Sequence, residues 1–165
     1  MERGRDFLRA QVSNAVMQHR TLLENLRDHA GQAEDPRYRT LCERWQPRLE
    51  THQRTLEEYR AALGETGGEG LKGALGSLLG KARDAVDAMR ESDFLRLVGD
   101  IVTIRQSQDT FATFAAAGTR LGEPRLAEIG RQCAQEHDEM QREFNLLAHE
   151  MFVEHASAAA AATTA

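Results

Sequence analysis

Proline, aromatic residues and long hydrophobic runs are scarce in this chain of 165 residues. It contains three prolines and 5% aromatic residues, and no apolar run approaches the roughly 20 residues that span a bilayer. The chain also has no serine or cysteine nucleophile signature, no phosphate-binding loop and no Cys-x-x-Cys redox motif. A transmembrane helix is therefore not predicted, and the usual sequence evidence for hydrolase or nucleotide-binding chemistry is missing. Alanine, leucine, glutamate, arginine and glutamine are abundant, a composition that favours α-helix.

The net charge and the cysteine content indicate which classes of partner and which cellular compartment to expect. The formal net charge of −5 argues against nucleic acid as the main partner, because a phosphate-binding surface should be basic. Met1 to Asp6 lead into a polar helical pattern without a secretory signal, which predicts a cytoplasmic protein with reduced thiols. Cys42 and Cys133 are expected to be core residues about 20 Å apart along the bundle, and therefore unbridged. A homodimer or another protein partner stays open, and membrane association is not expected.

Four long helical patterns, with apolar residues at steps of three and four, run through the chain. They cover residues 6–30, 36–63, 92–118 and 124–155. Asp35 and Ser92 are predicted N-caps, and Pro36 stands at a first helical position, where its missing backbone donor is tolerated. Residues 1–155 are predicted to form one helical bundle, and the alanine-rich residues 156–165 a low-complexity tail without fixed structure.

The segment between the second and third patterns sets the topology. Residues 65–70 form a glycine-rich linker. Residues 71–90 form an amphipathic pattern that we interpret as a short crossover helix lying on the bundle; a membrane-surface segment is the alternative. Short turns make each flanking helix pair antiparallel, whereas a connection of this length lets the two middle helices run parallel. The predicted fold is all-α: a four-helix bundle with a long crossover, carrying a short helix, between its second and third helices.

A polar layer interrupts the apolar stripes at the middle of the four helices. At about 1.5 Å per residue, His19, His52, Gln108 and Glu136 lie at one height, with His137 beside the last of them. Burial of a polar group without a partner is costly, so these side chains should satisfy one another or a ligand. Imidazole and carboxylate groups bind zinc, iron or manganese. Two interpretations stay open: a metal site with all five residues as candidate ligands, or a hydrogen-bonded layer without metal.

Helix faces can be assigned from the same periodicity. The core stripe of the third pattern is read as Phe94, Val98, Ile101, Gln108, Phe111 and Ala115, with Ile104 or Arg105 between Ile101 and Gln108. On the fourth pattern, His137, Asp138 and Glu139 are read most simply as a solvated polar cluster. His29 lies near a helix end and shows no spacing that links it to the polar layer.

The order of elements and several local sequences resemble the bacterial ferritin-like stress proteins of the rubrerythrin and ferritin superfamily. The resemblance rests on the helix start at Asp35-Pro36, the run Leu49 to Glu57 around His52, the crossover, and Leu121-Gly122 before the last helix. It covers about residues 6–152. The resemblance implies a ferritin-like bundle, a stress-associated role, and a core site where glutamates and a histidine hold two metal ions.

Carried over position by position, the resemblance implies a degenerate site. His52 matches the histidine of the family's second helix and Glu136 a glutamate of its fourth, whereas His19, Arg48 and Gln108 stand where carboxylates are expected. A di-iron centre needs about four carboxylates in a low-dielectric core. Ferroxidase-type activity is therefore not expected, and no catalytic residue is assigned. A mononuclear or degenerate site for iron, manganese or zinc is implied; the alternative is a helical scaffold or protein-interaction module without metal.

Overall fold

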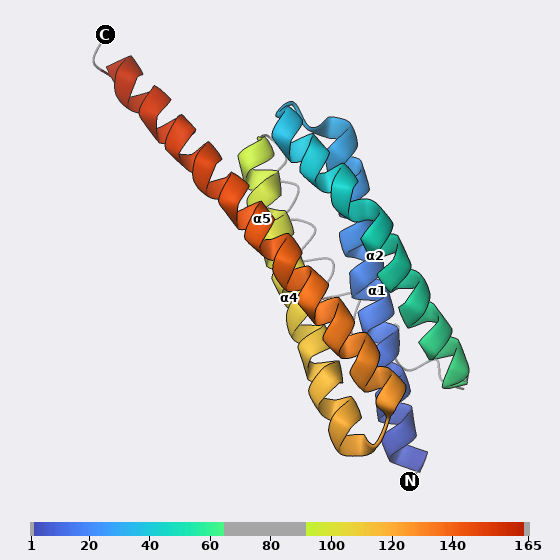
Figure 1. Cartoon of the computed structure of the whole chain (residues 1–165). Helices are drawn as coiled ribbons and strands as arrows, with labels where there is room; N and C mark the ends of the chain where they lie inside the picture. The colour runs from blue at the N-terminus through green and yellow to red at the C-terminus, as the bar shows by residue number, and fades with distance from the viewer. Residues whose placement is uncertain (1, 65–91, 164–165) are drawn as a thin grey trace.

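The computed structural model describes residues 2–64 and 92–163, which form four α-helices (Figure 1). Their bounds are α1 Glu2–Gln32, α2 Pro36–Ala62, α4 Asp93–Leu121 and α5 Pro124–Thr163. The described ranges contain no strand, as the all-α prediction requires, and none of their helices is long and apolar enough to cross a membrane. The linker at 65–70 and the crossover helix at 71–90 lie outside the described residues.

The helix boundaries follow from the capping residues. Asp35 accepts a hydrogen bond from the backbone N–H of Arg37 at 2.8 Å, with Pro36 at the first helical position of α2. Ser92 accepts from the backbone N–H of Leu95 at 3.3 Å and starts α4. Gly122 ends α4 in the left-handed conformation with a φ of 68°. The predicted N-caps are confirmed.

The described helices form two antiparallel hairpins, α1 with α2 and α4 with α5, which pack side by side (Figure 1). The Asp93 carboxylate at the start of α4 accepts from the backbone N–H groups of Glu34 and Asp35, at 2.8 and 2.6 Å. At the other end, Arg9 donates to the carbonyl of Leu63 at 2.7 Å, just after α2. The end of α2 and the start of α4 therefore lie at opposite ends of the bundle. The two middle helices run parallel, as predicted.

Two apolar clusters fill the bundle, one toward each end. The first contains Leu22, Leu26, Tyr38, Trp45, Leu49, Ile104, Met140 and Phe144 among others. The second contains Val12, Leu56, Tyr59, Phe111, Leu126 and Cys133. On three helices the residue at the boundary between the clusters is a histidine, buried at His19, His52 and His137. Cys42 and Cys133 belong to different clusters and are unbridged, as predicted.

The face that α4 turns to the core differs from the predicted stripe. Its buried residues are Leu97, Asp100, Ile104, Ser107, Phe111, Phe114 and Gly118, so most of the predicted positions are only partly buried. One reason is the close approach of α5. A Cβ added at Gly118 would overlap the backbone of Ala127, and one added at Gly130 would overlap the backbone of Ala115. These backbone contacts fix the rotation of α4, and apolar periodicity carries no information about them.

The alanine-rich tail is not unstructured over its described part. Helix α5 runs to Thr163 and projects beyond the ends of the neighbouring helices (Figure 1). The expectation that the tail lacks fixed structure is therefore wrong for residues 156–163. Alanine has the highest helix propensity, and these residues extend a helix that is already nucleated inside the bundle.

Candidate metal centre

Three imidazoles from three different helices meet at mid-bundle. His19 comes from α1, His52 from α2 and His137 from α5, with exposed fractions of 1%, 3% and 0%. One ligand atom from each lies within 4.8 Å of the other two, which makes this the one such group of histidine, cysteine and acidic side chains among the described residues. The ring centroids are 5.3 to 5.8 Å apart. We call these three residues the imidazole triad.

Gln53 determines which nitrogen of His19 carries the proton. The Gln53 amide nitrogen donates to Glu57 at 2.7 Å and to the carbonyl of Val16 at 3.3 Å. The hydrogen bond from Gln53, and next the one from Arg20, lower the pKa of Glu57, so its carboxylate is ionised and only accepts. The Gln53 oxygen therefore faces His19 Nδ1 at 3.0 Å and accepts its proton. The lone pair of His19 is left on Nε2, which is buried without a hydrogen-bond partner among the described residues.

The backbone fixes His137 in the same way. Its Nδ1 lies 2.8 Å from the carbonyl oxygen of Cys133, one helical turn earlier. Because a carbonyl only accepts, Nδ1 is the protonated nitrogen, and Nε2 carries the lone pair. That Nε2 is also buried without a hydrogen-bond partner in the described part of the chain. Both histidines thus present an unprotonated nitrogen to the interior.

His52 has the least satisfied ring of the three. Neither of its nitrogens has a hydrogen-bond partner among the described residues. Its Nε2 lies 3.2 Å from a carboxylate oxygen of Glu136, a close polar contact whose geometry is not that of a hydrogen bond. The Glu136 side chain is 22% exposed, so it stands between the triad and solvent.

The fourth helix contributes an apolar wall to the centre. The ring of Phe111 on α4 lies 5.8 Å from that of His19, 6.2 Å from His52 and 5.0 Å from His137, between centroids. Phe111 is itself 1% exposed. An ion bound by the triad would therefore have imidazole ligands from three helices and an aromatic face on the fourth side.

Burial keeps the triad uncharged at neutral pH. Desolvation is the main cause that lowers the pKa of His19 from 6.5 to about 4. Desolvation also lowers the pKa of His52, against the opposing charge of Glu136, and lowers that of His137 with help from His19 and His52. Neutral imidazole is the form that binds metal ions, so no proton has to leave the triad on binding.

The ligand atoms of the triad lie within 4.8 Å of one another. At that upper limit an ion equidistant from all three would lie roughly 2.8 Å from each, against about 2.0–2.1 Å for a zinc–imidazole bond. Each ring would have to move inward by under about 1 Å, a change within reach of side-chain rotation. Metal-binding histidines usually donate their second ring N–H to a carboxylate, a carbonyl or a water. The Cys133 carbonyl has this role for His137, and the Gln53 amide oxygen takes it for His19.

The candidate ligands predicted from the sequence separate into two groups. His19, His52 and His137 come together, with Glu136 in contact with His52. His137, read as part of a solvated face, is fully buried, and that interpretation is wrong for this residue. Gln108 was expected in the same layer. Its amide nitrogen instead donates to Asp138 on α5 at 3.2 Å, and no described hydrogen bond links it to the triad.

A second buried polar cluster was not predicted. Asp100 on α4 is 1% exposed and accepts from the hydroxyl of Tyr38 at 2.6 Å. Both its oxygens lie 3.0 Å from Nδ1 of His29. Burial, and next the charge of Asp100, raise the pKa of Tyr38, so the hydroxyl keeps its proton and donates. This cluster ties α4 to the α1–α2 hairpin, and neither Asp100 nor Gln53 carries a sequence signal that could have revealed its role.

Comparison with protein family models, with curated proteins and with solved structures finds no match for this chain. The resemblance to ferritin-like proteins therefore stays a prediction.

Proposed function

We propose that this chain is a metal-binding helical bundle that holds one divalent transition-metal ion at His19, His52 and His137. The observation that carries the proposal is the convergence of three buried imidazoles, in which neither His19 Nε2, His137 Nε2 nor either nitrogen of His52 has a hydrogen-bond partner among the described residues. Each such buried atom costs about 1–3 kcal/mol if it stays unpaired. Metal coordination would satisfy one nitrogen of each ring at once.

The donor set favours zinc among the ions suggested by the sequence. Imidazole suits zinc, copper, nickel and iron(II), whereas manganese prefers carboxylate and water ligands. Zinc takes four ligands, so three histidines leave one position for water or for the neighbouring Glu136. The group of candidate ligand atoms found among the described residues contains no carboxylate oxygen. This supports a site for a single ion and not a two-ion oxidative centre. A stress-associated role and a cytoplasmic location stay predictions.

The test uses untagged protein, stripped with a chelator and titrated with zinc, copper(II) or manganese. We expect one zinc ion per chain and a higher melting temperature, since a ligand at 100 times its Kd stabilises the native state by about 2.7 kcal/mol. The variant His137→Gln should lose both effects. His149→Gln is the matched control, because His149 is exposed on the same helix and should bind like the wild type.

The alternative function is a scaffold or interaction protein whose polar layer holds no metal. A wild-type protein that is purified without metal and shows no change in melting temperature with any of the three ions would establish that alternative. The His137→Gln variant would then alter stability alone.

A further inference from the structure

The triad has one side on which a charged, partly exposed group touches an imidazole. On the α4 side Phe111 covers the rings, and on the α1–α2 side the amide of Gln53 is 7% exposed. At the α2–α5 boundary, by contrast, Glu136 lies 3.2 Å from His52 Nε2 with a side chain that is 22% exposed. At this boundary a partly exposed carboxylate is in direct contact with the triad.

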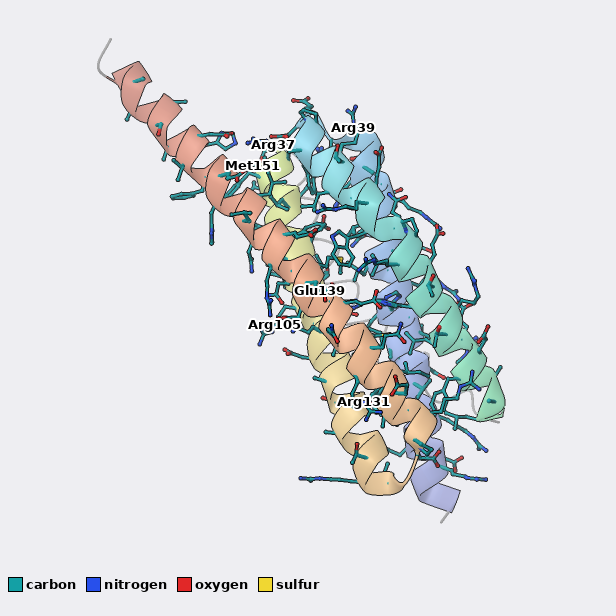
Figure 2. The ribbon with its side chains drawn as sticks, viewed as in Figure 1. Arg37, Arg39, Arg105, Arg131, Glu139 and Met151 are labelled. Atoms are coloured by element: carbon teal, nitrogen blue, oxygen red, sulfur yellow. The ribbon has the colours of Figure 1, made fainter. Side chains whose placement is uncertain are left out.

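Arg48 lies across that route. One of its terminal nitrogens is 3.9 Å from a Glu136 oxygen and 3.7 Å from a Glu139 oxygen. Its guanidinium carbon stands 5.0 Å from the centre of the Trp45 ring, in a cation–π contact. Figure 2 labels Glu139 near the middle of α5. A single cation thus contacts two carboxylates at the entrance and offsets one of their two negative charges.

The Arg48 contacts are weak enough to open. The Arg48 side chain is 55% exposed and that of Glu139 45% exposed, and ion pairs at such positions contribute at most about 1 kcal/mol. The innermost carboxylate, in turn, contacts a 3% exposed imidazole that has no hydrogen-bond partner among the described residues. The acidic pair therefore leads to an unsatisfied buried ligand and is more than a charged surface patch.

We propose that Arg48, Glu136 and Glu139 form a gate through which a divalent cation enters and leaves the triad. This inference rests on the proposed function. The incoming hydrated cation displaces the guanidinium, so the two carboxylates have a cation beside them at every stage. Glu136 then replaces water ligands of the ion and passes it to His52, the nearest imidazole. In the resting protein, Arg48 covers the entrance and slows exchange.

The experiment measures the rates of cobalt(II) binding and release in the full chain by stopped-flow absorption, with cobalt as a spectroscopic substitute for zinc. Glu136→Gln removes the inner carboxylate, and Arg48→Gln removes the guanidinium group that lies across the entrance. Glu143→Gln and Arg44→Gln are the matched controls. Arg44 and Glu143 pair on the same two helices, and their replacement changes the net charge identically. Arg44 lies about one turn from Arg48, and Glu143 about two turns from Glu136. Rates are compared at low and at high ionic strength, because a general field effect is screened by salt whereas direct contact is not.

The gate predicts that Glu136→Gln slows both binding and release, by about tenfold, while Arg48→Gln speeds both severalfold, at either ionic strength. The controls should stay within twofold of the wild type. If all four variants bind one cobalt ion at the wild-type rate, the gate is wrong while the metal site stands. An effect of Glu136→Gln on release alone would make Glu136 a resident ligand and also overturn the gate. If the wild type binds no cobalt or zinc, both proposals fail.

Discussion

Oε1 of Gln53 lies 3.0 Å from Nδ1 of His19, across the interface between α2 and α1. Other contacts determine the direction of this hydrogen bond, because the amide nitrogen of Gln53 already donates to Glu57 and to the Val16 carbonyl. The Glu57 carboxylate fixes the orientation of the Gln53 amide, and that amide selects the His19 tautomer with its proton on Nδ1. The lone pair of His19 is therefore on Nε2, inside the core. This chain of contacts distinguishes His19 from a core histidine that only fills space.

Removing Gln53 should weaken metal binding without removing a ligand. In Gln53→Ala, His19 Nδ1 loses its acceptor and the ring is free to rotate or change tautomer. We expect zinc affinity to fall by about 10- to 100-fold, the usual effect of losing a partner that orients a ligand. The stability of the metal-free protein should fall by about 1–3 kcal/mol because the buried N–H is unpaired. Calorimetric titration and urea unfolding measure the two effects.

Gln11→Ala serves as the control for this variant. Gln11 is exposed on α1, and its replacement should change neither zinc affinity nor stability by a measurable amount. Equal zinc affinities for Gln53→Ala and Gln11→Ala would show that Gln53 has no part in orienting His19.

The metal-free protein should lose stability in mild acid. The pKa of His19 is lowered to about 4, and those of His52 and His137 are also lowered, whereas an unfolded histidine titrates near 6.5. Below pH 6.5 the unfolded chain therefore binds more protons than the native one, and the free energy of unfolding falls as the pH drops toward 4. Each histidine contributes at most about 1.4 kcal/mol per pH unit. Urea unfolding between pH 7.5 and 5 measures the slope, above the range where most carboxylates titrate.

A variant at one histidine separates the triad from other titrating groups. His137→Leu should reduce the slope, since it removes one of the buried bases. Gln11→Ala, at an exposed position without a titratable group, should leave the slope unchanged. A slope that is the same in the wild type and in His137→Leu would mean that the triad does not control acid stability.

The two tyrosines of α2 provide a matched test of the Asp100 cluster. Both are buried, but the Tyr38 hydroxyl donates to Asp100 at 2.6 Å, whereas the Tyr59 hydroxyl has no hydrogen-bond partner among the described residues. Tyr38→Phe should destabilise the protein by about 1–3 kcal/mol, since it takes a donor from a buried carboxylate. Tyr59→Phe should be neutral or stabilising. Equal effects of the two variants on the free energy of unfolding would argue against a structural role for the cluster.

Helix boundaries and topology could be predicted because their signals are local. Asp35 and Ser92 act on the residues beside them, and the length of the connection between the hairpins allowed the middle helices to run parallel. His19 and His52 could be placed on their stripes because apolar neighbours three and four residues away flank them on both sides.

The residues whose placement the sequence did not predict depend on contacts between helices. After Cys133, a step of three leads to Glu136 and a step of four to His137, and periodicity does not choose between them. The structure turns His137 inward. Gln53 adjoins His52 and is buried only because α1 packs over that side of α2. Asp100 is buried because donors from two other helices reach it. Such partners cannot be identified from one helix pattern at a time.

The contact between α4 and α5 should tolerate no added carbon atom at its two glycines. Gly118→Ala and Gly130→Ala each place a Cβ against the backbone of the facing helix. We expect a loss of about 1–3 kcal/mol for each, the usual cost of overpacking. Gly31→Ala is the control, since a Cβ there meets no atom within 4 Å and should leave stability unchanged or raise it. If all three variants have the same thermal stability, the helices are not in backbone contact.

The central claim is that the three imidazoles bind one metal ion together, and anomalous diffraction from a crystal of the zinc-loaded protein tests it most directly. Data collected on both sides of the zinc absorption edge locate the ion without reference to the protein coordinates. We predict a single strong peak between the rings of His19, His52 and His137, about 2.0–2.1 Å from one nitrogen of each. A peak only at surface carboxylates or exposed histidines, with the triad empty, would contradict the account.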